Sequence, residues 1–119
     1  MMVRMRLEAL ESLKAEVLRV LDEVVKDYRA EALLLSGGLD TSIIACLASR
    51  HFKPETLTVG LSGVEAPDLK YAKLVAECFN LKNHVKLFSF EEAAEAARQV
   101  VRIVRSFDPM EVRNDVTIY

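Results

Sequence analysis

The stretch that decides the fold is ALLLSGGLDTS, residues 32 to 42. Four apolar residues run directly into a hydroxyl, two glycines, a leucine, an aspartate and two further hydroxyls. The apolar run suits a short strand covered on both faces, and the helix pattern that follows contains IIACLA. Two adjacent glycines carry a folding entropy cost that an ordinary strand-to-helix connection does not require. We therefore expect this loop to bind a ligand.

The same strand-to-helix pattern occurs twice more along the chain. Residues 56–61 predict a second strand, after which SGVEAPD turns the chain and Pro67 begins a helix that runs to about Phe79. HVKLF predicts a third strand, and Ser89 and Glu92 have capping-box spacing at the start of the next helix. The sequence therefore predicts an α/β fold, a Rossmann-like three-layer sandwich in which helices flank a short parallel sheet of three strands.

Helices are also predicted at both ends of the chain. Over residues 5–29 apolar side chains recur at spacings of three and four, which predicts an amphipathic helix carrying Leu10, Leu13, Val17, Leu21, Val24 and Tyr28. Near the other end, Asp108 and Pro109 are typical of a helix start, but the pattern runs into VTIY without a stop signal. We expect residues 1–119 to form a single, incomplete domain.

The composition excludes several classes of protein. The formal charge of −2 gives no basic excess of the kind that nucleic-acid and anionic membrane partners require. No apolar run approaches a membrane span and the N-terminus has no signal core, so we expect a cytoplasmic protein. Cys46 and Cys78 lie in apolar helical patterns and are predicted to be buried free thiols, while His51 and His84 are predicted at the surface or a strand edge.

The glycine loop has the composition of a phosphate site. A parallel strand delivers its loop to the carboxyl edge of the sheet, where open α/β folds bind ligands. Gly37 and Gly38 let backbone N–H groups approach a pyrophosphate, and the next helix directs its positive end there. The hydroxyls of Ser36, Thr41 and Ser42 add further donors.

Asp40 is the unusual member of the loop, because a carboxylate beside phosphates is repulsive unless a divalent cation lies between them. We therefore expect magnesium at Asp40. The alternative is an ordinary glycine turn in which Asp40 or Thr41 caps the following helix.

At these residues the sequence resembles a known superfamily. SGGLDTS resembles the pyrophosphate-binding loop of the ATP pyrophosphatases, which include asparagine, argininosuccinate, GMP and NAD synthetases. Its DTS ending is usual in argininosuccinate synthetases, but TLTVGLSGVEAPDLKYAKLVAECFNLKNH resembles the asparagine synthetases. Argininosuccinate-synthetase-like chemistry is therefore less favoured. The resemblance covers about Ala30 to Arg113.

The resemblance implies a role for each matched residue. It places the triphosphate of ATP and its Mg²⁺ on Ser36, Gly37, Gly38, Leu39, Asp40, Thr41 and Ser42. Leu34 and Val59, with Gly60 beside them, match the adenine side, and simple core packing is the alternative for both apolar residues. Arg113 matches an arginine that stabilises charge as the α-phosphorus is attacked, and the alternative is a surface arginine paired with Glu111 or Asp115.

The implied function is adenylation of a small carboxylate by ATP, with pyrophosphate release and then amide formation, and aspartate is the candidate substrate. The sequence departs from the family because it has no glutaminase domain and no second glycine-rich motif, and Met110 and Glu111 replace two threonines. The alternatives are a non-catalytic nucleotide-binding or assembly module and a fragment of a longer synthetase. Members of the superfamily place later strands beside the first, so the resemblance implies the strand order 3-2-1 for the three strands of this chain. The first strand is then a bare edge, and we expect a homo-oligomer or a partner subunit.

Overall fold

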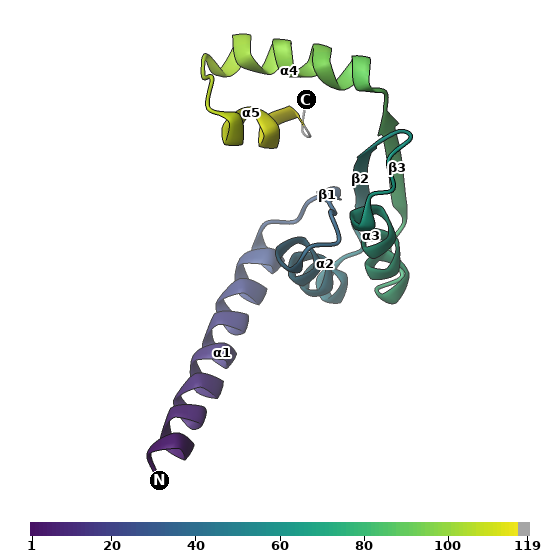
Figure 1. Ribbon diagram of the computed structural model, residues 1–119. Coiled ribbons are helices and arrows are strands. Elements are labelled where there is room, and N and C mark those ends of the chain that lie inside the picture. Colours follow the sequence, from purple (N-terminus) through teal and green to yellow (C-terminus); the bar gives the residue numbers. More distant parts are fainter. Residues whose placement is uncertain (117–119) are drawn as a thin grey trace.

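The computed structural model describes residues 1–116, which form five helices and three strands (Figure 1). In chain order they are α1 (Met2–Asp27), β1 (Ala32–Leu34), α2 (Leu39–His51), β2 (Glu55–Leu61), α3 (Pro67–Cys78), β3 (Asn83–Phe88), α4 (Phe90–Val104) and α5 (Pro109–Val116). The predicted elements are all present. The first helix begins and ends two to three residues earlier than the expected range of 5–29.

The three strands form one parallel sheet with the order β1-β2-β3. Leu34 pairs with Leu57 of β2, and Leu57 pairs in turn with His84 of β3. The expected order 3-2-1 is therefore confirmed, with β2 in the centre. Because all strands run the same way, their carboxyl ends share one edge, and the glycine loop leaves β1 at that edge.

Helices α2 and α3 supply the core that covers the sheet. One buried cluster joins Leu35 to Ala45 of α2, to Ala72 and Ala76 of α3 and to Leu81. Alanines at these positions let the helix backbones approach the strands closely. A parallel sheet flanked by helices is thus confirmed, and its core is built largely from small side chains.

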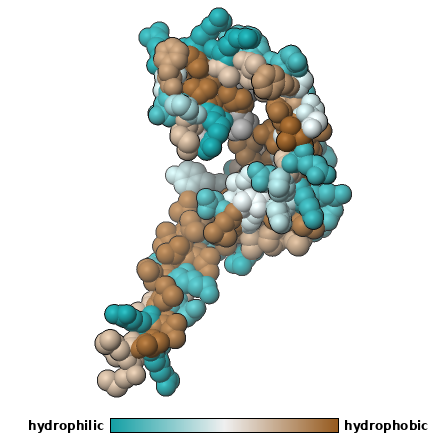
Figure 2. All heavy atoms as spheres, in the orientation of Figure 1, coloured by the Kyte–Doolittle hydropathy of each residue, from teal (hydrophilic) through white to brown (hydrophobic). Residues whose placement is uncertain are grey.

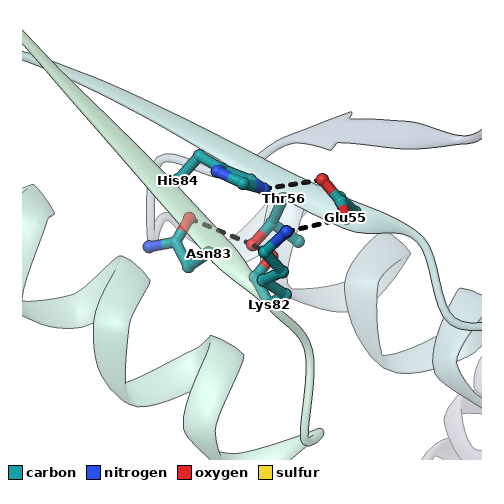
Figure 3. A network of polar contacts seen from close by, with 5 residues as sticks. All are labelled: Glu55, Thr56, Lys82, Asn83 and His84. Atoms are coloured by element: carbon teal, nitrogen blue, oxygen red, sulfur yellow. Dashed lines mark hydrogen bonds and ion pairs between the residues drawn. The ribbon is translucent and has the colours of Figure 1, made fainter.

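The centre of the sheet is polar on the side that the helices cover. Thr56 and Thr58 of β2 are buried, at 0% and 3% exposure. Their hydroxyls each lie 3.0 Å from Oδ1 of Asn83, and Thr58 Oγ1 lies 2.8 Å from the Leu35 carbonyl oxygen. Figure 3 shows the Thr56–Asn83 contact between β2 and β3. These bonds fix the register of all three strands, since a slip would leave buried hydroxyls unpaired.

The opposite side of the sheet is open at β1. Leu34 is 48% exposed and Leu57 is 42% exposed, so the expectation that the first strand is covered on both faces is wrong for the described residues. The reason is the course of the chain after β3. Helices α4 and α5 pack on each other and lie beyond the carboxyl ends of the strands, so they do not lie over β1 (Figure 1).

Helix α1 extends away from the rest of the molecule (Figure 1), whose principal extents are 58 × 33 × 30 Å. Only its last turns make contacts, where Leu21 and Val25 pack against Leu47 and Ala48 of α2. His51 at the end of α2 also approaches α1, with Nε2 3.0 Å from Oδ1 of Asp22. The predicted amphipathic helix is confirmed as α1, but most of its apolar face has no partner among residues 1–116.

Of the remaining predictions for single residues, some are confirmed and others are wrong. Ser89 and Glu92 form the expected capping box, and Asp108 accepts from the N–H groups of Met110 and Glu111 at the start of α5. The expected burial of both thiols is wrong, because Cys46 is half-buried and Cys78 is exposed at the end of α3. The end of VTIY, residues 117–119, lies outside the described residues. Within those residues, no helix has the length and apolarity that a bilayer span requires.

Candidate functional site

The glycine loop turns sharply at Gly37, whose φ of +79° lies in the left-handed region. A side chain at this position would also meet backbone, since an added Cβ would lie 2.5 Å from the Ala72 nitrogen and 2.7 Å from Cβ of Tyr71. Gly37 is therefore required by its own conformation and by the close approach of α3. This second requirement was not visible in the sequence.

Gly38 differs from Gly37 in its backbone conformation. It is the N-cap of α2 and is extended, with φ −71° and ψ 170°. No side chain among residues 1–116 caps this helix, so the alternative in which Asp40 or Thr41 is the cap is wrong. An added Cβ at Gly38 would meet only the Ser36 hydroxyl, 3.3 Å away. The loop is thus open in front of Gly38.

The loop hydroxyls bond within the loop. Ser36 Oγ and Thr41 Oγ1 lie 3.1 Å apart, and the N–H of Gly38 donates to Ser36 Oγ at 3.3 Å. Ser42 donates its hydroxyl proton to the Gly38 carbonyl at 2.6 Å. These bonds shape the turn and leave the first N–H groups of α2 without a side-chain acceptor among the described residues. An exposed helix end of this kind attracts anions.

A groove of about 300 Å³ lies beside the loop. Its walls combine apolar strand residues with loop hydroxyls and a carboxylate, namely Leu34, Leu35, Ser36, Thr41, Leu57, Thr58, Val59 and Asp68. Leu34 pairs with Leu57, which is two residues before Val59, so all three project from the same face of the sheet. The structure therefore brings Leu34, Val59, Ser36 and Thr41 together as the sequence analysis expected.

A second, smaller pocket of about 180 Å³ adjoins the first and shares Val59 with it. It is almost entirely apolar and is lined by Val59, Gly60, Leu61, Phe88, Ala93, Ala96 and Val116. Gly60 belongs to this pocket, and a Cβ there would come within 3.0 Å of the Leu69 side chain. Absence of a side chain at Gly60 therefore keeps β2 close to α3.

Arg113 lies on α5, whose last described residue, Val116, reaches the smaller pocket. The arginine is exposed, and within residues 1–116 no ion pair joins it to Glu111 or Asp115. The same part of the chain shows no hydrogen bond from Arg113 to the glycine loop. Its assignment to the site therefore depends on the family resemblance.

The sequence analysis missed four residues of the groove, and Asp68 is the charged one among them, beside Leu35, Leu57 and Thr58. Asp68 is the second residue of α3, directly after Pro67, and it lines the groove together with Ser36 and Thr41. The signal was present in the proline–aspartate pair after the second strand, because that connection ends at the same sheet edge as the glycine loop.

The carboxylates available here fit one mode of magnesium binding. The described residues contain no group of three or more histidine, cysteine or acidic side chains placed to hold a metal. Mg²⁺ commonly binds through one or two carboxylates together with substrate phosphates and water. Asp68, which lines the groove, and Asp40, exposed in the first turn of α2, are the carboxylates that such a mode would use.

The two histidines each approach a carboxylate that is distant in sequence. At the amino ends of the strands, Glu55 lies 3.1 Å from Lys82 Nζ and 2.6 Å from His84 Nε2 (Figure 3). Hydrogen bonds from Lys82 first and from His84 second lower the pKa of Glu55. This cluster lies at the opposite edge of the sheet from the groove, so it belongs to the scaffold.

Comparison with known proteins identifies the family. The sequence matches the asparagine synthase family over residues 16–119. It is 33% identical over 98 residues to an asparagine synthetase [glutamine-hydrolyzing] of Zea mays, covering 73% of this chain and 16% of that protein. It is 30% identical over 121 residues to the asparagine synthetase [glutamine-hydrolyzing] of Cricetulus griseus, covering 92% of this chain and 21% of that protein.

A solved structure shows the same fold. The NH3-dependent NAD synthetase from Campylobacter jejuni, in complex with the nitrate ion, superposes with a TM-score of 0.53 at 18% identity. The match covers 87% of this chain and 45% of that one. The chain spans between 16% and 21% of the two curated relatives described above. The glycine loop, the groove and the match over residues 16–119 lead to one conclusion: the chain belongs to the asparagine synthase family.

Proposed function

We propose that this chain forms the nucleotide-binding part of an ATP-dependent, amide-forming site of the asparagine synthetase kind. The observation that carries the proposal is the groove of about 300 Å³, whose lining joins two loop hydroxyls to an apolar strand wall, with Thr41 contributed by the first turn of the uncapped helix α2. An anion-binding end beside a flat apolar wall is the arrangement that a nucleotide requires.

The phosphate chain is assigned to the loop from Ser36 to Ser42. The N–H groups of Leu39 and Asp40 lie at the start of α2, where the helix dipole favours negative charge. Gly38 admits a phosphate because nothing but the Ser36 hydroxyl lies near the position of a Cβ. Asp40 and Asp68 are proposed to hold Mg²⁺, which would offset the charge of the phosphates.

The adenine is assigned to the strand wall of the groove. Leu34 and Val59 offer exposed or half-buried side chains on one face of the sheet, and apolar side chains of this kind can cover the face of a base. Gly60 continues this wall into the smaller pocket.

The acceptor chemistry is proposed from the family. A carboxylate substrate, with aspartate as the candidate, would attack the α-phosphorus while Arg113 stabilises the developing charge. The products would be pyrophosphate and an acyl adenylate, and attack of ammonia or another amine on its carbonyl carbon would form the amide and release AMP. We also propose a cytoplasmic location, where ATP and small carboxylates are available.

A second candidate is a nucleotide-binding module without turnover. The lining of the groove favours it, because every lining residue comes from β1, β2, the glycine loop or the first turn of α3. In-line attack needs aligned groups on both sides of the phosphorus. Release of pyrophosphate by the chain separates the two candidates.

The site is tested by Asp40→Asn with ATP titrations followed by NMR or calorimetry. If Asp40 acts through the cation, the substitution should weaken ATP binding about tenfold in magnesium and less than about twofold in its absence. Equal losses under both conditions would show that the carboxylate has no role in metal binding.

The matched control is Glu77→Gln, which makes the same carboxylate-to-amide change. Glu77 lies near the carboxyl end of α3, whereas the groove adjoins the first turn of that helix. We expect it to leave ATP binding unchanged in both conditions. Wild-type protein that binds no ATP at millimolar concentration, while remaining folded by circular dichroism, would overturn the proposed function.

A further inference from the structure

The largest surface that the proposed function does not use is the apolar face of α1. Leu10 and Leu13 are 58% and 61% exposed, and Val17 and Val24 are 49% and 48% exposed. Figure 2 shows hydrophobic side chains along the length of this projecting helix. The ion pairs of Arg19 with Glu16 and Glu23 lie at other positions of the helix.

The chain as a whole exposes more surface than a monomer of its mass. Its accessible surface is 9163 Å², whereas a folded monomer of 13.4 kDa is expected to expose about 6500 Å². Its radius of gyration is 17.8 Å, against about 13.5 Å for a compact chain of this length. The excess of about 2700 Å² is larger than the roughly 800 Å² that each partner buries in a standard interface.

The apolar face of α1 has a heptad pattern, and its members are exposed except for Leu21, which is half-buried and packs against α2. Apolar residues recur with alternating steps of four and three from Val3 to Tyr28, at Val3, Leu7, Leu10, Val17, Leu21, Val24 and Tyr28. Lys14 occupies the one remaining position of the series. This spacing is typical of a helix that pairs with another helix along its length. Leu13 and Val20 widen the stripe on one side.

We propose that α1 pairs antiparallel with α1 of a second copy of this chain. In the register that centres the pair between Ala15 and Glu16, Leu10 faces the partner's Leu21 and Lys14 faces the partner's Val17. Every layer then contains at least one apolar side chain, and Lys14 reaches solvent alongside Glu11, which it already contacts at 3.4 Å. Parallel pairing in register would place Lys14 against the partner's Lys14, which is repulsive.

Charge complementarity supports the same register. Beside the stripe, Arg6 lies opposite the partner's Asp27, and the two-fold axis makes this attractive pair occur twice. Between them Leu13 lies opposite the partner's Val20. The antiparallel arrangement also places the two folded bodies at opposite ends of the helix pair, since each body adjoins only the carboxyl end of its own α1 (Figure 1).

The first test is the oligomeric state of the 119-residue chain, measured by light scattering and sedimentation equilibrium. We expect a dimer at micromolar concentration. Leu10→Glu should convert it to a monomer without loss of fold, because Leu10 is exposed in the single chain. A monomeric wild type at hundreds of micromolar, or a dimer that Leu10→Glu leaves intact, would overturn the proposal.

The second test distinguishes the register by charge reversal. Arg6→Glu and Asp27→Arg should each raise the dimer dissociation constant about tenfold or more, because each creates two like-charge contacts. The double variant should restore the wild-type value. If Arg6→Glu is instead rescued by Glu11→Arg, and not by Asp27→Arg, the helices pair in parallel. That result would contradict the antiparallel register.

The matched control is Arg19→Glu, the same reversal on the ion-paired side of α1. It should leave the dissociation constant unchanged, although the helix itself loses two ion pairs. ATP binding should be unaltered in all these variants, so failure of this inference is distinguishable from failure of the proposed function.

Discussion

Two adjacent glycines in the loop meet different physical requirements. Gly37 has a left-handed φ and its α-carbon approaches the backbone of α3 at Tyr71 and Ala72. Gly38 has an ordinary conformation, and an added Cβ there would meet only the Ser36 hydroxyl. The first glycine therefore serves the fold, and we propose that the missing side chain of the second serves the ligand.

Substitution of the two glycines should separate stability from binding. Gly37→Ala should cost about 1–3 kcal/mol or more, because it combines a left-handed φ with backbone overlap. Gly38→Ala should cost under about 1 kcal/mol, as at other N-caps. Thermal melts by circular dichroism measure both changes, and equal losses would contradict this assignment.

The larger variant Gly38→Val extends the test to the ligand. Its branched side chain would fill the phosphate approach, so we expect ATP binding to be lost while the protein remains folded. Retention of ATP binding in this variant would mean that the phosphates lie elsewhere.

Glu55 makes the stability of the sheet depend on pH. Lys82 and His84 lower the pKa of its carboxyl, so the stabilisation is present above the ordinary glutamate value of 4.5 and is lost as pH falls through the lower folded value. Glu55→Gln should therefore lower the melting temperature at pH 7, and this effect should shrink as the pH falls through the lowered pKa of the folded protein. The change should be small because the side chain is 53% exposed.

The control for this pH effect is Glu77→Gln, whose carboxylate lies 3.9 Å from Lys73 in a single exposed pair. Its melting temperature should change less at pH 7 than that of Glu55→Gln. A Glu55 effect that persists unchanged down to the lowest pH at which the protein stays folded would show that packing of the side chain, rather than its charge, is responsible.

At the scale of elements, local signals predicted the strands and helices well. The capping box at Ser89, the proline at the start of α3 and the three strands all appear where the sequence indicated them. Each of these signals acts within a few residues of its own position. The position of a helix relative to the sheet is not a local property.

The predictions that were wrong or missing concern tertiary contacts between elements. Leu34 was expected under a second layer and is exposed because α4 and α5 lie beyond the strand ends. The carboxylate partners of His51 and His84 lie 29 residues away in each case, so spacing could not reveal them. Asp68 was missed for the same reason, since two connections that meet at one sheet edge are far apart in the sequence.

The capping box also gives a prediction for α4. Ser89 Oγ accepts from the Glu92 N–H at 3.2 Å, and Glu92 Oε2 accepts from the Ser89 N–H at 2.8 Å. Ser89→Ala should cost about 1 kcal/mol and speed amide exchange in the first turn of α4. Ser62→Ala, in the exposed turn after β2, should change neither. Equal exchange in both variants would contradict a capping role.

At the scale of the molecule, we predict that the chain alone binds ATP weakly and makes no asparagine. A helix end contributes only about 0.3–1 kcal/mol to a bound charge, whereas micromolar affinity needs about 8 kcal/mol. One apolar wall leaves the base partly hydrated. We expect high-micromolar to millimolar binding, measured by NMR titration or calorimetry.

The activity test is pyrophosphate release in the presence of ATP, magnesium, aspartate and ammonium. We expect none, because in-line attack needs aligned groups on both sides of the phosphorus, and the described groove is lined only by β1, β2, the glycine loop and the first turn of α3. Turnover at an ordinary enzymatic rate, from protein whose intact mass matches the 119-residue chain, would contradict this prediction and require an acceptor site within the chain.

The open edge of the sheet belongs to the same scale. β1 is an edge strand of three residues with exposed Ala32 and Leu34, and pairing of this edge with another chain stays a prediction. The variant Leu10→Glu distinguishes association through the β1 edge from association through α1. It alters only the helix, so a dimer that forms through the β1 edge should persist in this variant.

The spatial order of the strands has a consequence for synthesis on the ribosome. Because β1, β2 and β3 lie side by side in chain order, each strand can join an existing edge as it emerges, and none has to insert between two others. β1 and β2 can pair while β3 is still untranslated, which at ordinary elongation rates leaves the far edge of β2 bare for roughly 1–5 s. During that interval the nascent sheet is held by a single strand pair, and its unpaired edge is the surface that a chaperone would recognise.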